Sequence, residues 1–361
     1  MTLREISNKR LNSQKIAGTT FNTAAEIVGW MGAIQAQDYS MAKWAIGVRL
    51  LSHSEERIAA SFKKGEIIRI HLMRPTWHFV SPADIYWMLE LTAQHIKSSL
   101  KSRHKELEFT GAIIGKSKDV LVKALLTRKF LTREELANEF SKANIRTDDN
   151  RLSHLMLWAE LEGLVCSGKM KGGKQTYALL QERVPVRKSL TRDESLSELA
   201  KRYFTSHGPA TLKDFAWWSG LPVADARRAL DFIKPDFFSE IIGPEQYWFA
   251  DSSSDFNHKT KSVHLLPAYD EFLISYKDRS ASLLRGDNKK SVSNNGIFYP
   301  IIVVNGIVTG FWKRSTRGNK INIEVNFFRP QEQLIIRLVK DAASRLGSFL
   351  GKEAEVRIIK N

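Results

Sequence analysis

Two glutamines separated by one small residue, Gln35 and Gln37, are the side chains whose type and spacing best suit joint chemistry. Carboxamides carry no charge, but they can position a water molecule and stabilise a developing charge through their dipoles. On a helix the two side chains would point about 200° apart, whereas in an extended segment residues i and i+2 share a face. The alternative is structural, with both amides hydrogen-bonded to backbone where a helix ends.

The sequence lacks the common signatures of stronger chemistry. It contains no His, Cys and Asp spacing typical of metal sites, no glycine-rich phosphate loop followed by Lys and Ser or Thr, and no nucleophile elbow. Cys166 is the one cysteine of the sequence, which excludes an internal disulfide framework and a cysteine-based zinc site. We predict no metal and no cofactor. An active site must consist of ordinary polar groups, or the protein performs no chemistry.

The helix that precedes the two glutamines begins with a capping box headed by Thr23. Apolar residues at positions 27, 30, 31 and 34 then form one stripe. If the two glutamines cooperate, this helix must end near Ile34 and the chain must straighten. Asp38 comes directly afterwards and has two possible roles. A cap for the next helix is favoured, because Asp is a common N-cap residue; the other role is a negative potential beside a positive charge that develops during a reaction.

Three helices followed by a two-stranded hairpin are predicted three times along the chain. This order is typical of a winged helix, and three degenerate copies support the interpretation more strongly than one copy does. The predicted modules occupy residues 1–110, 111–190 and 191–260. Their helices are expected at 23–34, 41–48, 54–64, 118–126, 131–140, 149–161, 196–204, 210–215 and 223–233, and their hairpins at 67–80, 163–180 and 237–249.

Residues 261–361 predict a β-rich, barrel-like domain. Strands are expected at 263–266, 272–275, 298–304, 307–313 and 320–328, with a helix at 332–350 and a last strand at 355–359. The fold class predicted for the whole chain is α+β, with three tandem winged-helix (helix-turn-helix) modules followed by this C-terminal domain.

The chain carries 55 Lys and Arg residues against 39 Asp and Glu residues, a formal net charge of +16. Such an excess usually means a polyanionic partner, most often nucleic acid and sometimes an anionic membrane; a merely soluble basic protein is the alternative. No apolar run approaches the roughly 20 residues of a membrane span, and the first residues contain no signal-peptide core. We expect a nucleic-acid partner, no membrane, and an intracellular, reducing compartment.

Polar and basic residues on the predicted hairpins and helices are the candidate DNA contacts, because neutralising phosphates supplies much of the affinity. The densest group lies at the tip of the hairpin that joins residues 307–313 to 320–328, although a solvated loop tip is the alternative there. His78 also has a second interpretation, as a histidine hydrogen-bonded within its hairpin. The full set is Arg74, Thr76, His78, Arg151, Lys169, Lys171, Lys174, Arg227, Arg228, Lys313, Arg314, Arg317 and Lys320.

Three segments resemble the AlkZ/YcaQ-like proteins, in that family's order: Gly-Ala-Ile-Gln-Ala-Gln-Asp at 32–38, Arg-Pro-Thr-Trp-His at 74–78 and Leu-Leu-Pro-Ala-Tyr-Asp-Glu-Phe at 265–272. These are tandem winged-helix DNA glycosylases that excise bulky alkylpurines and can unhook interstrand crosslinks. The resemblance extends from about residue 3 to residue 359. It implies that Gln35 and Gln37 are catalytic, because Gln-apolar-Gln is the family's catalytic motif. The YcaQ-like branch has Asp at the second position, whereas this chain has Gln37, as in the AlkZ-like branch.

The resemblance supplies a chemistry that two carboxamides can support. An N7-alkylated purine is already cationic and leaves without protonation, so the protein needs only to hold a water near C1′ and stabilise an oxocarbenium-like sugar. We predict a monofunctional DNA repair glycosylase that hydrolyses the N-glycosidic bond of alkylated purines, bulky or crosslinked ones included, in duplex DNA. We also predict that the partner is double-stranded DNA, that the protein is a monomer, and that it acts in the cytoplasm at the bacterial nucleoid.

Two alternatives stay open. The first is a non-catalytic winged-helix DNA-binding protein, a regulator or damage sensor, whose output would survive the loss of Gln35. Against it, winged-helix regulators usually dimerise to read paired half-sites, whereas three unequal modules in one chain suit recognition of shape and backbone. The second is a structural or protein-interaction module, which would bind no DNA at physiological salt.

Overall fold

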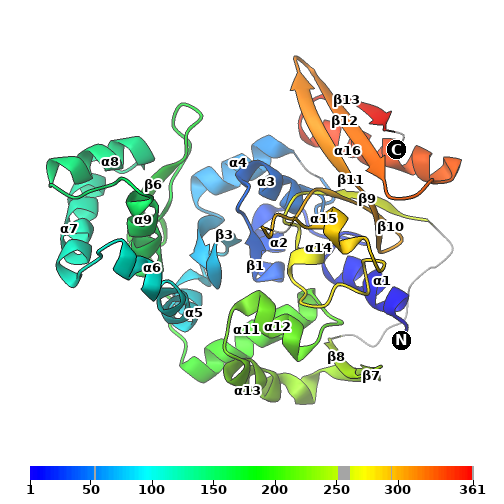
Figure 1. The fold of residues 1–361 in the computed structure, drawn as a ribbon, viewed down its shortest axis with the longest axis horizontal. Helices are drawn as coiled ribbons and strands as arrows, with labels where there is room; N and C mark the ends of the chain where they lie inside the picture. The colour runs from blue at the N-terminus through cyan, green and yellow to red at the C-terminus, as the bar shows by residue number, and fades with distance from the viewer. Residues whose placement is uncertain (53, 251–260, 294, 360–361) are drawn as a thin grey trace.

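The computed structural model describes residues 1–52, 54–250, 261–293 and 295–359, which form a mixed α+β structure (Figure 1). In this part of the chain, two three-stranded sheets, a two-stranded sheet and a five-stranded sheet are joined by helices. None of the helices described has the length and apolar character that crossing a membrane requires.

Helices and a hairpin form the first group of elements: α1 (Leu3–Ser13), α2 (Ala24–Met31), β1 (Ala33–Gln35), α3 (Tyr39–Gly47), α4 (Glu55–Lys64), β2 (Ile68–Leu72) and β3 (Arg74–Val80). The Thr23 side chain accepts from the backbone N–H of Glu26, and the Glu26 carboxylate accepts from that of Thr23, which confirms the predicted capping box. The short strand β1 pairs antiparallel with the last strand of the hairpin, so the sheet order is β1-β3-β2.

The order of elements from α2 to β3 occurs twice more. After α5 (Ile85–Ser99) and α6 (Lys101–Glu106), the second group is α7 (Gly111–Arg128), β4 (Leu131–Thr132), α8 (Arg133–Lys142), α9 (Arg151–Leu161), β5 (Val165–Ser167) and β6 (Thr176–Leu179). After α10 (Leu180–Arg183), the third group is α11 (Arg192–Ser206), α12 (Leu212–Ser219), α13 (Val223–Ile233), the 3-10 helix η1 (Lys234–Asp236), β7 (Phe238–Ile242) and β8 (Glu245–Phe249). The second sheet has the order β4-β6-β5, and in the third group Ala210 forms a bridge with Trp248 of β8. The segments that precede α3, α8 and α12 therefore each pair with the last strand of the hairpin in their group.

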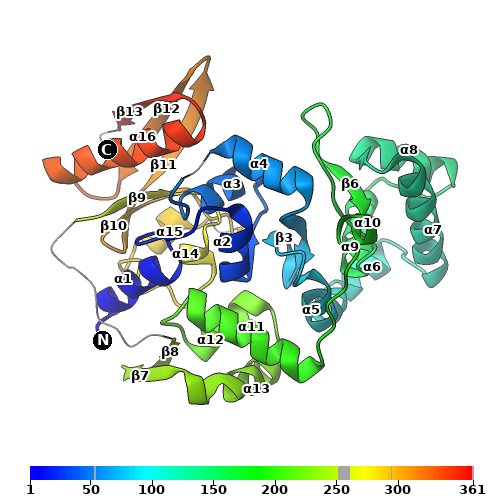
Figure 2. The same cartoon turned by 180° about the vertical axis from the view of Figure 1, so that it is seen from behind.

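The last group of elements contains the five-stranded sheet: β9 (Val263–Leu266), α14 (Glu271–Ile274), α15 (Asn288–Ser291), β10 (Ile301–Val304), β11 (Ile307–Arg317), β12 (Lys320–Phe327), α16 (Gln333–Phe349) and β13 (Glu353–Ile358). The strand order is β13-β12-β11-β10-β9, and only β12 and β13 pair in parallel among the strands described. The long β11–β12 hairpin extends beyond the rest of the molecule (Figures 1 and 2).

The strand predicted at residues 272–275 is wrong, because this segment is the helical turn α14. The Asp270 side chain accepts from the Phe272 N–H over 2.9 Å and so begins the turn. All the apolar residues of the turn are buried. A short, continuous apolar run occurs in buried strands and in buried helices alike, so the pattern could not exclude a helix here.

The sheet β1-β3-β2 lies between two hydrophobic cores. Ile34 and Phe79, which face each other across β1 and β3, belong to a core shared with α2–α4, the five-stranded sheet and α16. Ala33 and Val80, on the opposite face, belong to a core shared with α5 and α11–α13. The second group packs mainly around its own core. Gln35 alternates with Ile34, so its side chain lies on the face of Ala33 and Val80.

Candidate active site

Gln35 ends β1, the edge strand of the first sheet. The preceding helix ends at Met31, three residues before the expected Ile34, because Gly32 takes a φ of 76°, a value that glycine adopts without steric cost. The chain is extended from Ala33 to Gln35 and bends at Gln37, so the extended segment expected to carry both glutamines ends at the first of them.

The two glutamines differ in burial and are joined through a backbone group. Gln35 is 3% exposed, whereas Gln37 is exposed. The backbone N–H of Gln37 donates to Oε1 of Gln35 over 3.1 Å. This bond orients the Gln35 carboxamide and leaves one lone pair of Oε1 for a further donor.

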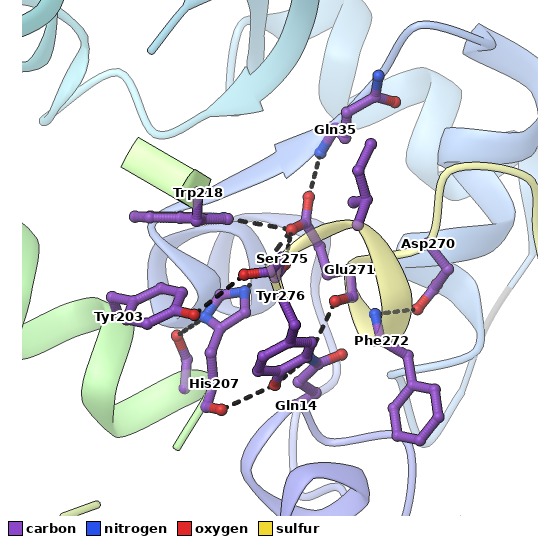
Figure 3. Close-up of polar contacts among 12 residues, drawn as sticks. Gln14, Gln35, Tyr203, His207, Trp218, Asp270, Glu271, Phe272, Ser275 and Tyr276 are labelled. Carbon is purple, nitrogen blue, oxygen red and sulfur yellow. Dashed lines mark hydrogen bonds and ion pairs between the residues drawn. The ribbon is translucent and has the colours of Figure 1, made fainter. Parts of the chain in front are cut away.

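A buried carboxylate supports the free edge of β1. The backbone N–H of Gln35 donates to Oε1 of Glu271 over 2.6 Å (Figure 3). The other oxygen, Oε2, accepts from the indole N–H of Trp218 over 3.2 Å and from the hydroxyl of Ser275. The Gln35 carboxamide points away from this carboxylate (Figure 3). Glu271 therefore fixes the backbone of Gln35 without occupying its side chain.

Glu271 is fully buried, and burial alone would raise its pKa. His207, with Nε2 at 3.7 Å from Oε2, together with Ser275 and the N–H of Gln35, outweighs this effect and lowers the pKa of Glu271 to about 2. Burial lowers the pKa of His207, and the Glu271 carboxylate opposes this decrease. A negative charge therefore lies beside the backbone of the candidate catalytic strand.

Arg49 and Asp270 hold the segment that carries Glu271. Both are buried, and Nη1 and Nη2 of Arg49 each donate to one oxygen of the Asp270 carboxylate over 2.8 Å. The remaining Arg49 N–H groups donate to oxygens of Gln14 and Ala45. Because this paired geometry is specific, it fixes the start of α14 against the first group of elements.

Asp38 is the N-cap of α3. Its carboxylate accepts from the Met41 N–H over 3.0 Å, which confirms the favoured interpretation of this residue. Buried Arg69 donates to the carbonyl oxygens of Ala36 and Gln37 over 3.0 and 3.4 Å. The link between β1 and α3 is therefore held at both ends.

The strand opposite β1 carries three of the predicted DNA contacts, Arg74, Thr76 and His78. His78 is fully buried, and its Nδ1 lies 3.0 Å from the carbonyl oxygen of Thr76, so the hydrogen bond considered within the hairpin is present. The Arg74 guanidinium lies 5.9 Å from the ring centre of Trp217. Because the His78 side chain is fully buried, we do not retain it as a contact to a phosphate.

Arg151 is also buried, which corrects its predicted role as a DNA contact. Its guanidinium donates to the carbonyl oxygen of Leu107 and lies 5.0 Å from the ring centre of Phe109. These contacts join α9 to the segment after α6, and we assign Arg151 a structural role.

The other basic candidates are exposed, apart from the partly buried Arg314. In the loop between β5 and β6, Lys171 and Lys174 pair with Glu135 and Glu134, and Lys169 lies over the ring of Phe130. Surface pairs of this kind are weak, so the lysines can exchange these partners for phosphates.

The β11–β12 hairpin carries Lys313, Arg314, Arg317 and Lys320. Arg314 donates to the Ser40 hydroxyl over 2.6 Å, which connects this hairpin to the start of α3. The tip of the hairpin and the β5–β6 loop both point toward the top of the two views (Figures 1 and 2).

Arg227 and Arg228 do not share this location. They belong to α13, which lies at the lower side of both views (Figures 1 and 2). Arg228 also pairs with Asp193 of α11. The predicted basic contacts therefore divide between two sides of the molecule.

Sequence reasoning assigned no role to Glu271, Arg49, His207 or Trp218. Asp270 and Glu271 lie within the segment at 265–272 that carries the resemblance, and this was the one signal in the sequence that pointed to them. Periodicity could not reveal their partners, because 236 positions separate Gln35 from Glu271.

Comparison with known proteins gives consistent matches along the chain. Residues 28–349 match the family described as DNA glycosylase AlkZ-like. A curated protein of Streptomyces sahachiroi, named interstrand DNA cross-link repair glycosylase, is 22% identical over 377 residues and is covered to 99%, as is this chain. The solved structure of Streptomyces sahachiroi DNA glycosylase AlkZ is similar in fold, with a TM-score of 0.81 at 21% identity, over 99% of this chain and 100% of that one.

Proposed function

The chain belongs to the DNA glycosylase AlkZ-like family, and we propose that it hydrolyses the N-glycosidic bond of alkylated, cationic purines in duplex DNA through a positioned water. The observation that carries the proposal is the Gln35 carboxamide, which is oriented by the Gln37 N–H while the Glu271 carboxylate holds the Gln35 backbone. Because one relative is named for interstrand cross-link repair, we include crosslinked purines among the substrates.

The leaving group explains why amides are sufficient. When the C1′–N9 bond breaks, its electron pair neutralises the positive charge of the alkylated ring, so no acid needs to protonate the base. The sugar becomes oxocarbenium-like and needs a water on its open face. The free lone pair of Gln35 Oε1 accepts a hydrogen bond from that water, and Gln37 keeps Gln35 oriented. Preorganised groups of this kind stabilise the transition state without reorganising during the reaction.

We further propose that each group of three helices and a hairpin is a winged-helix module and that the modules bind DNA as a monomer. The recurring pairing before the second helix supports this assignment. The basic tips of the β5–β6 and β11–β12 hairpins, on the same side of both views, are the proposed phosphate contacts (Figures 1 and 2). We expect the protein to act in the cytoplasm, at the bacterial nucleoid.

The proposal is tested with a duplex oligonucleotide that carries one N7-methyl-2′-deoxyguanosine, in which abasic sites are detected by alkaline strand cleavage. Wild-type protein should release the base, and Gln35→Ala should lower the single-turnover rate by about 100-fold or more, the usual effect of losing one preorganised polar group. Gln37→Ala should retain more activity, because the Gln37 backbone N–H survives the substitution.

Gln246→Ala is the matched control, since Gln246 is an exposed glutamine on β8 whose amide bonds Ser239. It should react at the wild-type rate. Absence of base release by the wild-type protein on N7-methylguanine and on a bulkier cationic adduct would refute the proposed function. DNA binding that persists under those conditions would favour a non-catalytic DNA-binding protein.

A further inference from the structure

Buried polar atoms without partners are concentrated on one short stretch of β3. Twelve buried side-chain nitrogen and oxygen atoms lack a hydrogen-bond partner among the described residues, and five of them belong to residues 74–78. They are Nε and Nη2 of Arg74, Oγ1 of Thr76, Nε1 of Trp77 and Nε2 of His78. Since leaving such atoms unpaired is costly, their concentration in one strand indicates a place where something other than the protein supplies the partner.

His78 lies directly opposite Gln35 in the paired strands. The Ala36 N–H donates to the Trp77 carbonyl over 2.7 Å, so Ala36 and Trp77 form a hydrogen-bonded pair. Hydrogen-bonded and non-hydrogen-bonded pairs alternate along antiparallel strands, which makes Gln35 and His78 a non-hydrogen-bonded pair with closely spaced side chains. Their Cβ atoms are expected about 5 Å apart and on the same face.

The hydrogen bond within the hairpin fixes the tautomer of His78. A carbonyl oxygen only accepts, so Nδ1 of His78 carries the proton that bonds the Thr76 carbonyl. Nε2 then presents a lone pair. Burial, followed by the positive charge of Arg74, lowers the pKa of His78 to about 3, and the imidazole is neutral at physiological pH.

Building on the proposed function, we propose that His78 is a further catalytic residue whose Nε2 accepts a proton from the water held by Gln35. One hydrogen of the water bonds to Gln35 Oε1 and the other to His78 Nε2, which leaves an oxygen lone pair directed at C1′. As the C1′–N9 bond breaks, its electron pair stays on the purine, and the water oxygen bonds to C1′. One water proton passes to Nε2 and then to solvent, and the other remains on the new C1′ hydroxyl. The Arg74 charge favours return of that proton to solvent.

Two substitutions distinguish the roles of the two ring nitrogens of His78. His78→Asn places an amide near Nδ1, which can still donate to the Thr76 carbonyl, but removes Nε2. His78→Gln places an amide oxygen or nitrogen near Nε2. The His78→Asn variant should lower the single-turnover rate of N7-methylguanine release by about 100-fold, within the range of general acid–base contributions, and His78→Gln should recover part of the loss.

DNA affinity and folding are measured on the same proteins. The dissociation constant for a duplex with a tetrahydrofuran abasic-site analogue should stay within about twofold of wild type, because His78 is proposed to contact the water and not the phosphates. The matched control is His264→Asn on β9, whose Nε2 is also buried without a partner among the described residues and whose pKa burial also lowers, to about 4. This control should retain the wild-type rate.

A His78→Asn variant that releases the base within threefold of the wild-type rate, while Gln35→Ala is inactive, would overturn this proposal and leave the proposed function intact. A loss of rate that only parallels a loss of DNA affinity would also overturn it, because that result indicates a structural role. If His78→Asn does not fold, the partly active His78→Gln supports the proposal, and a fully active His78→Gln at unchanged affinity contradicts a role specific to imidazole. Wild-type protein that releases no base ends both proposals together.

Discussion

The two three-stranded sheets have the same strand order and differ in the length of chain between the edge strand and the next helix. In the sheet β4-β6-β5, Thr132 both ends the edge strand and caps α8. In the sheet β1-β3-β2, Ala36 and Gln37 separate the strand end at Gln35 from the N-cap Asp38. The candidate active site therefore includes a two-residue extension of an element that the second group uses only to start a helix.

The residue directly before each N-cap sharpens this difference. Leu131 precedes the cap of α8 and Ala210 precedes the cap of α12, and both are fully buried. Gln37 precedes the cap of α3 and is exposed. The position before the N-cap holds a buried apolar residue in the second and third groups and an exposed polar residue in the first. A polar side chain at this position can contact a substrate, which a buried apolar side chain cannot.

The two regions also differ in where their charges lie. The ions around the first sheet, such as Arg49 and Asp270, are buried, whereas Lys171 and Glu135 of the second group form a surface pair. Removing one member of a buried pair leaves the other charge buried without a counter-ion, which lowers stability strongly. Removing one member of a surface pair changes stability little. Substitutions in the two regions should therefore have very different effects.

The largest effect is expected from Arg49→Ala. Loss of the guanidinium leaves the buried Asp270 carboxylate without its counter-ion and should lower the free energy of unfolding by about 3–5 kcal/mol. Urea unfolding at neutral pH measures the change. Arg146→Ala is the matched control in the second group, where the arginine side chain is 61% exposed and pairs with Asp148, and it should leave the stability close to that of wild type. Equal losses in the two variants would contradict the contrast between the regions.

Exchanging the side chains at positions 131 and 37 tests whether an apolar residue closes the core at one position and not at the other. Leu131→Gln places an amide in the closed core of the second group and should lower the free energy of unfolding by about 3 kcal/mol. Gln37→Leu adds an apolar side chain at an exposed site and should change it by less than about 0.5 kcal/mol. The measurement is again urea unfolding. A stability loss in Gln37→Leu as large as that in Leu131→Gln would show that the two positions are equivalent.

Glu271→Gln should cost about 2 kcal/mol at neutral pH, because charge-assisted hydrogen bonds from Gln35, Trp218 and Ser275 are weakened. The pKa of Glu271 is lowered to about 2 in the folded protein, from an ordinary value of about 4.3 in the unfolded chain. Its contribution is therefore complete above about pH 4.3 and is lost as the pH falls through 2. The stability difference between wild type and Glu271→Gln should narrow over this interval.

Glu135 provides the comparison for this pH dependence. The Lys171 side chain and the Thr132 backbone lower its pKa to about 2 as well, but Glu135 lies at the surface. Salt screens exposed charges more strongly than buried ones. High salt should therefore abolish the pH-dependent difference for Glu135→Gln and preserve the difference for Glu271→Gln, and identical salt responses would contradict the burial argument.

Local patterns in the sequence predicted the local structure well. The helix starts at Thr23 and Asp38 depend on side chains that bond a backbone N–H three residues onward, so the segment itself contains the necessary information. The helices and hairpins of the three groups were predicted for the same reason. The spacing of the two glutamines predicted that the chain straightens after the helix, but it placed the extended segment after Ile34, whereas the strand occupies Ala33–Gln35.

The partners of Gln35 could not be predicted in this way. Glu271 is distant in sequence, and its orientation depends on Trp218 and Ser275, which belong to different groups of elements. The burial of His78 and Arg151 likewise depends on elements that pack against them, whereas residue type alone suggested a DNA contact for Arg151 and left two interpretations open for His78. Tertiary packing determines the burial and the partners of these residues, and a single sequence contains no direct signal of tertiary packing.

The smallest effect on stability, and a distinct effect on DNA binding, is expected from Lys171→Ala. Its pair with Glu135 is exposed, so the free energy of unfolding should change by less than about 0.5 kcal/mol. If the β5–β6 loop contacts a phosphate, the slope of log K against log salt concentration should fall by about 1. Lys142→Ala removes another exposed lysine, on α8 and paired with Glu139, and should leave the slope unchanged. Equal slopes for both variants would mean that the second group acts through its overall charge, and the loop would then have no particular role in positioning DNA toward the first sheet.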